Sequence, residues 1–421
     1  MSPGVCGKPY RWHHQQSRFV SMSKVHSIAL DETMEVDRVL DHLQGKSRGP
    51  TVVFFGGIHG NEPAGVFALR HVFQEIRSKH IPIHGEIYAI TGNLGALERS
   101  MRYQQEDLNR IWFPERISTI MEERQVQHAE EDELKHLYNL LRDILENGKP
   151  PFYFLDLHTT SSDTTPFMVM NDSLLNRKYA SHYPLPIILG IEEYLEGALL
   201  SYINELGYVS LGFESGQHND GKAIQNCIDF IRYSLTLTET VPISEKEKEK
   251  LKAAISAIDE VPHRFYEIYH QHLIGLQSDF KMLPGFVNFQ EIPKGKSIAL
   301  VHGEELKTKK RRQIFMPLYQ EQGNEGFYFI RPIPKILLWM SKELRRFKVD
   351  HLLVRLPGVK WKSKEKDTLV VDQRVARFFA KSFFHLLGYR ARKFDETHLV
   401  AKNRERASKS QDYKETGWFK A

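Results

Sequence analysis

Short apolar runs alternate with helical patterns over the first half of the chain. "TVVFF" (51–55) is continuously apolar and rich in β-branched and aromatic residues, which is typical of a strand buried on both faces. A helix is predicted to begin near Pro63, because apolar positions recur after it at helical spacing: Val66, Leu69, Phe73 and Ile76. A strand followed directly by a helix is the repeating unit of an α/β fold.

Two further apolar runs predict strands at 85–93 ("GEIYAITGN") and 152–160 ("FYFLDLHTT"). The segment 121–149 is rich in charge and predicts a long helix between them. This alternation predicts an α/β fold with a mixed sheet sandwiched by helices.

The charged run "SEKEKEK" (244–250) predicts the start of an exposed helix, and the pattern of apolar and polar residues changes after it. From about Pro262 onward, short apolar runs are broken by Pro and Gly, which favours a smaller β domain. We therefore predict four regions: a disordered N-terminal segment (1–23), the α/β domain (24–260), the small β domain (261–344) and a basic C-terminal extension (345–421). The extension is expected to hold one helix (375–389) and a polar end that frays.

Composition narrows the chemistry. The 421 residues include only two cysteines, Cys6 and Cys227, so neither a disulfide framework nor a thiolate metal site is expected, and any metal must be held by His, Asp or Glu. The formal net charge of +5 is too modest to indicate a nucleic-acid partner, and no apolar run is long enough to cross a bilayer. We expect a cytoplasmic protein without a membrane partner; the sequence allows a homo-oligomer but does not indicate one.

Three candidate metal ligands fall where predicted strands end. His59 and Glu62 lie in "GGIHGNEPAG" (56–65), and His158 lies in "DLHTTSS" (156–162). Two imidazoles and one carboxylate form an open zinc site that leaves a coordination position for water, which suits hydrolysis. Asp156 lies on the same strand face as His158, where it is placed to orient that ligand.

A hydrolytic site also needs a base and a positive charge at the oxyanion. Glu214 in "GFESG" is either that base or an ordinary loop glutamate. The segment "MRYQQEDLNRIW" (101–112) offers three suitable polar side chains: Arg102, Asn109 and Arg110. The alternative is an ordinary polar loop in which the two arginines pair with Glu106 and Asp107.

"GGIHGNEPAG", "RYQQEDLNR", "DLHTTSS" and "GFESG", in that order along the chain, resemble the succinylglutamate desuccinylase and aspartoacylase family of zinc-dependent deacylases, which is related to metallocarboxypeptidases. The resemblance spans roughly residues 50–330 and includes "MLPGFVNFQ" and "MPLYQEQGNEGFYF". It implies one Zn²⁺ per chain, held by the three candidate ligands. It also implies roles for the other residues: Glu214 as general base and then proton donor, Arg102 as the group that polarises the scissile carbonyl, Asn109 and Arg110 as ligands of the substrate α-carboxylate, and Tyr319 as a contact from the second domain.

One position departs from the family pattern. Aspartoacylases carry an arginine ten residues before the catalytic glutamate, where it reads a second substrate carboxylate, and this chain has Asn204 there. We therefore expect a deacylase of a small N-acyl amino acid other than N-acetylaspartate. Two alternatives stay open: a metallocarboxypeptidase that acts on short peptides, and a non-catalytic zinc-binding protein whose basic tail binds an anionic partner.

Overall fold

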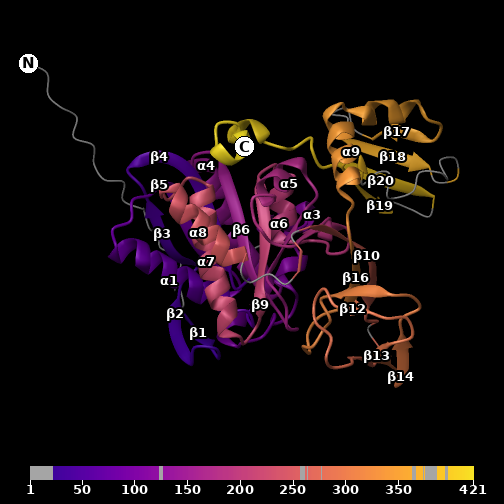
Figure 1. The fold of residues 1–421 in the computed structure, drawn as a ribbon, viewed down its shortest axis with the longest axis horizontal. Helices are drawn as coiled ribbons and strands as arrows, with labels where there is room; N and C mark the ends of the chain where they lie inside the picture. Colours follow the sequence, from indigo (N-terminus) through magenta and orange to yellow (C-terminus); the bar gives the residue numbers. More distant parts are fainter. Residues whose placement is uncertain are drawn as a thin grey trace, which may run out of the picture.

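A computed structural model of the chain describes residues 22–421 except 123–126, 257–260, 263, 276, 363–366, 373, 375–385 and 394–396. The described residues form a large mixed sheet flanked by helices, with a smaller β region beside it (Figure 1). This arrangement confirms the predicted fold class. Residues 1–21 of the segment expected to be disordered (1–23) and most of the helix expected at 375–389 lie outside the described residues, whereas Ser23 begins a strand.

The main sheet has eleven strands in the described part of the chain. Their bounds are β3 Val39–Gln44, β4 Ser47–Gly56, β5 His84–Thr91, β6 Phe152–Thr160, β7 Phe167–Met170, β8 Ile187–Leu189, β9 Val209–Gln217, β10 Phe265–Leu273, β12 Glu291–Ile292, β15 Arg312–Phe315 and β16 Glu325–Pro332. The spatial order is β12-β15-β16-β10-β8-β7-β9-β6-β4-β5-β3. Neighbours β5, β4, β6 and β9 run parallel, so their carboxyl ends share one edge.

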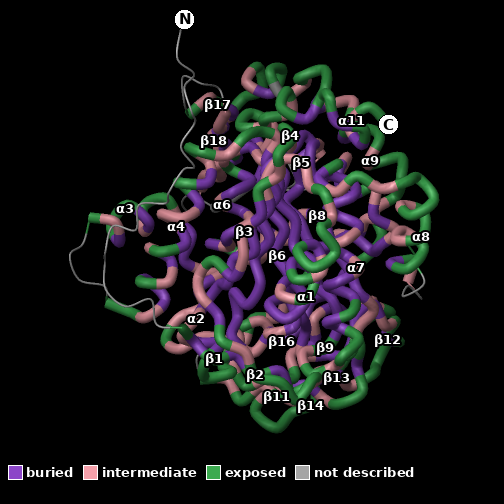
Figure 2. The backbone as a smooth tube through the Cα atoms, turned by 90° about the vertical axis from the view of Figure 1, so that its left-hand side faces the viewer, coloured by how far each residue is buried: buried purple, intermediate pink, exposed green. Residues whose placement is uncertain are grey.

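Strand β4 is buried on both faces, as its continuous apolar run predicts. Val52 and Phe54 belong to one hydrophobic core, whereas Val53 and Phe55 belong to a second core on the other face of the sheet. Figure 2 shows the strands of this region as buried backbone surrounded by exposed segments. Period-two alternation thus places one short run in two cores at once.

Helices cover both faces of the sheet. Helix α1 (Ala64–Ser78) follows Pro63, and all four apolar positions predicted for its stripe are buried. Its partner is α7 (Gly221–Leu237), which lies beside it (Figure 1). The other helices here are α2 Leu94–Glu98, η1 Leu108–Arg110, α3 Pro114–Glu122, α4 Ala129–Asn147, α5 Leu174–Ala180, η2 Ile191–Glu193, α6 Leu199–Glu205 and α8 Glu245–Ser256.

The helix predicted over 121–149 differs from the structure. Helix α4 begins only at Ala129, because the Glu131 carboxylate accepts the backbone N–H of His128 at 3.3 Å and so closes the amino end of the helix. Among the described residues, no helix has the length and apolar character needed to cross a membrane.

The smaller β region continues the main sheet through direct strand pairing. Its remaining strands are β11 Phe280–Met282, β13 Ser297–Val301 and β14 Glu304–Lys307, and a separate hairpin near the amino end is formed by β1 Ser23–Ser27 and β2 Glu32–Val36. Strand β10 pairs in parallel with β8, and the sheet therefore continues across residue 260. The boundaries at 260 and 344 stay predictions.

The C-terminal extension has its own sheet and core. Helix α9 (Lys335–Arg346) crosses the predicted boundary at 344, and the elements after it are η3 Val349–Arg355, β17 Val359–Trp361, β18 Thr368–Asp372, β19 Tyr389–Lys393, β20 His398–Asn403, η4 Ser410–Tyr413 and α11 Gly417–Lys420. The four strands are ordered β17-β18-β20-β19 and pack a small core around Leu369 and Tyr389.

The expectation that the polar end frays is wrong. After β20 the chain returns to the α/β part, where the yellow C-terminal segment lies over the sheet (Figure 1). Tyr413 and Trp418 are buried in the main core, and the Trp418 indole N–H donates to the Tyr153 hydroxyl at 2.8 Å. These aromatic contacts anchor the end of the chain.

Candidate metal centre and substrate pocket

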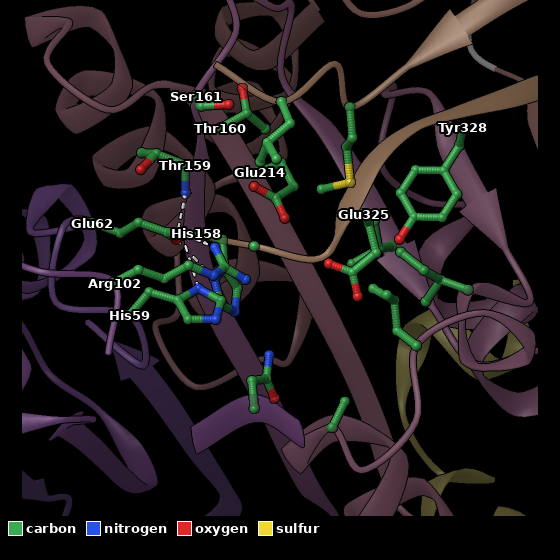
Figure 3. A pocket seen from close by; sticks show the side chains of 18 of the residues that line it. His59, Glu62, Arg102, His158, Thr159, Thr160, Ser161, Glu214, Glu325 and Tyr328 are labelled. Carbon is green, nitrogen blue, oxygen red and sulfur yellow. Dashed lines mark hydrogen bonds and ion pairs between the residues drawn. The ribbon is translucent and has the colours of Figure 1, made fainter. Parts of the chain in front are cut away.

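The candidate residues converge at the carboxyl edge of the parallel strands. His59 follows β4, and His158 near the end of β6 lies opposite Glu214 of β9 in the strand register. Figure 3 shows these side chains around one pocket, with Arg102 beside His59. Strand ends at such an edge bring distant parts of the sequence together, which is how residues about 150 positions apart share one site.

The turn after β4 is fixed by close backbone packing. A Cβ on Gly60 would lie 2.1 Å from the carbonyl carbon of Ala96, and Gly57 adopts a φ of 72°. Only glycine meets both demands without displacing the neighbouring chain. The glycines on either side of His59 therefore hold the turn in a single conformation.

Three side chains form a buried donor set. One ligand atom from each of His59, Glu62 and His158 lies within 4.8 Å of the others. The Glu62 carboxylate bridges the two rings: its oxygens lie 2.9 Å from Nδ1 of His59 and 2.9 Å from Nδ1 of His158. Both imidazoles thus present the same ring nitrogen to a common point, as ligands of one ion would.

The opposite nitrogen of each ring faces a carboxylate. Nε2 of His158 lies 2.7 Å from the Asp156 carboxylate, and Nε2 of His59 lies 3.2 Å from that of Asp107. Such carboxylates fix the orientation of an imidazole and make it a stronger ligand. Asp156 is where the sequence places it, whereas Asp107 is an orienting partner that sequence reasoning assigned only to an arginine.

The charge state of Glu62 suits a metal ligand. Burial raises its pKa, but the charges of His59 and His158 and the hydrogen bonds to them outweigh burial, and the pKa is held well below its usual range. The backbone N–H of Thr159 also donates to the carboxylate at 3.1 Å. Glu62 is therefore an anion in the folded protein.

Glu214 has the opposite electrostatics. Burial is the largest influence and raises its pKa to about 8, although the nearby charge of His158 acts against it. Its Oε2 atom is buried and has no hydrogen-bond partner among the described residues. A carboxylate that lines a pocket without a protein partner is available to a ligand in that pocket.

Arg102 carries positive charge to the donor set. Its guanidinium donates to the Asp107 carboxylate at 3.1 Å and lies 3.5 Å from the Glu62 carboxylate. The backbone N–H of Arg102 donates to the Gln322 side chain at 3.0 Å, so the loop that carries it is joined to the smaller β region. The arginine is thereby held at the pocket wall.

Asn109 and Arg110 line the same pocket farther from the donor set. The Asn109 side-chain oxygen accepts the backbone N–H of Leu199 at 2.9 Å, which ties η1 to the start of α6. Arg110 lies 3.3 Å from the Glu325 carboxylate, and Tyr328 of β16 completes this end of the pocket. Figure 3 shows Glu325 and Tyr328 across the pocket from His59 and Glu62.

The catalytic-domain model of the succinylglutamate desuccinylase/aspartoacylase family matches residues 48–231. The matched residues include the donor set and Glu214. The aspartoacylase of Xenopus tropicalis is 31% identical over 156 residues, which are 33% of this chain and 42% of the relative. The probable aspartoacylase of Acaryochloris marina is 27% identical over 163 residues, 37% of this chain and 52% of the relative. The chain thus matches about half or less of the length of these relatives.

Solved structures of the family share the fold. The succinylglutamate desuccinylase of Vibrio cholerae has a TM-score of 0.51 at 17% identity, covering 74% of this chain and 90% of that chain. The product-bound structure of the ectoine utilization protein EutE (DoeB) from Ruegeria pomeroyi has a TM-score of 0.50 at 15% identity, covering 75% and 97%. At these identities the likeness concerns the fold.

The family resemblance assigned Tyr319 to the substrate site, but this residue is not among those that line the pocket. Its hydroxyl donates to the Leu283 carbonyl at 2.8 Å and accepts the backbone N–H of Phe286 at 3.0 Å, and the residue is 37% exposed. These two backbone groups hold the hydroxyl within the smaller β region. Tyr328, later in the same motif, is the tyrosine that reaches the pocket.

Strand alternation offers a signal for Tyr328 that motif matching passed over. Phe327 and Phe329 belong to one core of the β region and Tyr328 to another, so the tyrosine faces the opposite side of β16. Period-two alternation does not account for Glu325, which lies three positions before Tyr328; the pairing of β10 with β16 has a register shift between Phe327 and Glu325. The partnership of Asp107 with His59 has no comparable local signal, because it depends on how two loops meet.

The position that departs from the family pattern lies outside the pocket. Asn204 is buried in α6, and its amide nitrogen lies 3.5 Å from the Ser173 hydroxyl. The α6 residues that line the pocket are instead Leu200 and Ser201. The structure therefore puts no cation of α6 against a substrate.

Proposed function

We propose that this protein is a zinc-dependent hydrolase that cleaves the amide bond of an N-acyl amino acid and releases a carboxylate and a free amino acid. The family of residues 48–231 supports the reaction class. The observation that carries the proposal is the presence, in one pocket, of the buried donor set and of Glu214, a buried carboxylate with an unpartnered oxygen.

His59, Glu62 and His158 fit a zinc ion by donor type, burial and convergence. When bound, zinc would polarise the scissile carbonyl and lower the pKa of a water molecule in the pocket. Asp107 and Asp156 would keep the two imidazoles in place, since each faces the ring nitrogen that is turned away from the donor point.

Glu214 is proposed as the proton carrier. As the carbon–oxygen bond forms, its carboxylate would accept a proton from the attacking water, and it would deliver that proton to the leaving nitrogen when the carbon–nitrogen bond breaks. Its raised pKa lies close to neutral pH, where a group can both accept and return a proton. Burial in the pocket is the main cause of that pKa.

Two arginines are proposed to handle negative charge on the substrate. Arg102 would face the oxygen on which charge develops during attack, because it already lies beside the donor set. Arg110, with Asn109, would bind the α-carboxylate at the other end of the pocket, where a planar guanidinium offers paired donors. A free α-carboxylate would thereby distinguish the substrate from internal peptide segments.

Loss of one imidazole is expected to abolish stoichiometric zinc binding. His158→Gln should retain well below one zinc per chain after dialysis, as measured by atomic emission, because two remaining donors do not form a closed site. His136→Gln is the matched control, since His136 lies 3.6 Å from Asp132 on the surface of α4 and is 61% exposed. Equal zinc content in both variants would exclude His158 as a ligand.

Asp156→Asn is expected to weaken zinc binding by about 10–100-fold without abolishing it. The amide cannot offer the charge that the carboxylate places 2.7 Å from Nε2 of His158. Competition with a chelator of known affinity measures the change. An unchanged dissociation constant would show that this carboxylate does not tune the ligand.

An assay with both N-acyl amino acids and C-terminal dipeptides separates the alternatives. Release of amino acids from C-terminal dipeptides, with no release from N-acyl amino acids, would favour a metallocarboxypeptidase. Zinc binding without turnover of either class would favour a non-catalytic zinc-binding protein.

A further inference from the structure

Beyond the donor set, one part of the pocket wall is formed by apolar side chains. They come from β7, from η2 and the loop after it, from the start of α6, from the segment after β15 and from β16: Val169, Met170, Ile191, Leu195, Ala198, Leu200, Met316 and Tyr328. The cavity measures about 130 Å³, small beside the ~300–1,000 Å³ of pockets for drug-sized ligands. It therefore suits a substrate of amino-acid size.

The apolar wall adjoins the arginine proposed for the α-carboxylate. Asn109 bonds to the first turn of α6, and that turn contributes Leu200 to the wall. Arg110 pairs with Glu325 at the start of β16, the strand that also carries Tyr328. The amino-acid half of a substrate held by its α-carboxylate would therefore have its side chain against this wall.

The described residues that line the pocket offer no additional arginine or lysine to bind a second carboxylate of the substrate. Arg102 and Arg110 are the only arginines or lysines among the described lining residues, and both already contact carboxylates of the protein. Glu325 adds negative charge at the same end of the pocket. An acidic side chain would lose its hydration there without gaining an ion pair, which disfavours its binding.

We propose that the amino acid released by this enzyme carries a neutral, apolar side chain of about the size of leucine, methionine or phenylalanine. The inference rests on the proposed deacylase function and adds its substrate class. Leu195, Leu200 and Met316 are the side chains proposed to read the substrate, because all three are only half-buried by the protein and line the pocket.

The first test is a panel of N-acetyl-L-leucine, -methionine, -phenylalanine, -glutamine, -glutamate and -aspartate with the zinc-loaded full chain. We expect kcat/KM for the apolar members to exceed that for the acidic members by at least about 10-fold, within the ~10–200-fold range that apolar pockets achieve. A preference for aspartate or glutamate overturns the substrate class while leaving the deacylase intact. Silence across the panel, with zinc bound, overturns the deacylase itself.

A second test moves the specificity. Leu200→Arg is expected to lower kcat/KM for N-acetyl-leucine by at least about 10-fold and to raise it for N-acetyl-aspartate, because it adds the missing cation. Glu205→Gln is the control on the same helix and should stay within about threefold of the native protein, because Glu205 is exposed and is not among the residues that line this pocket. An unchanged leucine-to-aspartate ratio in a folded, zinc-bound Leu200→Arg protein would contradict the assignment of this wall.

Binding of products gives a readout that does not depend on turnover. Free leucine should bind the zinc-loaded native protein at least about 10-fold more tightly than free aspartate, as measured by calorimetry. Equal binding of both amino acids would show that the apolar wall does not read the amino-acid half of the substrate and would overturn the proposal.

Discussion

Glu214→Gln is expected to bind zinc normally and to lose turnover by about 10²–10⁴-fold, the usual contribution of a positioned acid–base group. The amide keeps the shape of the side chain but cannot take up a proton from water. Glu214 is not one of the three convergent donors, so the substitution leaves them intact. Steady-state kinetics on the best substrate of the panel, with zinc content measured in parallel, tests this expectation.

Glu325→Gln is the matched control, because it makes the same substitution in the same pocket. Glu325 pairs with Arg110 at 3.3 Å, far from the proposed bond cleavage, so we expect its effect mainly on KM. Near-normal turnover of Glu214→Gln with zinc bound would contradict the assignment of Glu214 as the proton carrier. A similar loss of kcat in both variants would show that charge in the pocket, rather than proton transfer, is being measured.

The parts of this protein that local patterns encode were predictable from the sequence. The four consecutive apolar residues 52–55 predict strand β4, and the buried apolar stripe predicts helix α1. Once both are placed, His59 and Glu62 must lie at the carboxyl end of a parallel strand. The convergence of His158 with them follows from the same rule applied to β6.

Contacts that depend on the meeting of distant loops were not predictable. Asp107 lies near His59 only because the loop before η1 folds back against the turn after β4. The apolar wall joins residues of β7, α6 and the segment after β15, which no spacing in the chain relates. Likewise, nothing in the sequence of the polar C-terminal segment indicates that Trp418 contacts Tyr153, which lies more than 260 positions earlier.

The ion pairs that join the C-terminal extension to the pocket are also non-local. Asp172 follows the lining residues Met170 and Asn171, and its carboxylate is shared by Arg177 and Arg345, with Arg345 at 2.7 Å. A second pair, between Arg404 and Glu192 at 2.7 Å, holds the segment that carries Ile191. The extension thus anchors two of the loops that form the apolar wall.

Arg345→Met is therefore expected to lower the free energy of unfolding by about 3–5 kcal/mol, the usual cost of removing one partner from a buried ion pair. The Arg345 side chain is 1% exposed and that of Asp172 is 8% exposed, so water cannot replace the lost contacts. Urea unfolding followed by tryptophan fluorescence measures the change. Arg346→Met is the control on the same helix, because Arg346 is 72% exposed and its contact with Glu343 is 4.0 Å long; its effect should stay within about 0.5 kcal/mol.

The pH dependence of the difference in unfolding free energy between the native protein and Arg345→Met tests whether the ion pair with Asp172 is its cause. Burial raises the pKa of Asp172, but the charges of Arg177, Arg345 and Arg404 outweigh burial and hold that pKa below its usual value. A carboxylate with a lowered pKa in the folded state stabilises the protein above its unfolded pKa of about 3.9, and this stabilisation is lost as the pH falls further. The gap between the native protein and Arg345→Met should accordingly narrow below about pH 4. The variant should also raise KM for N-acetyl-leucine at unchanged zinc content, because the pocket loop that carries Asp172 loses its contact with Arg345. If the difference in unfolding free energy does not depend on pH and KM is unchanged, Arg345 contributes packing only.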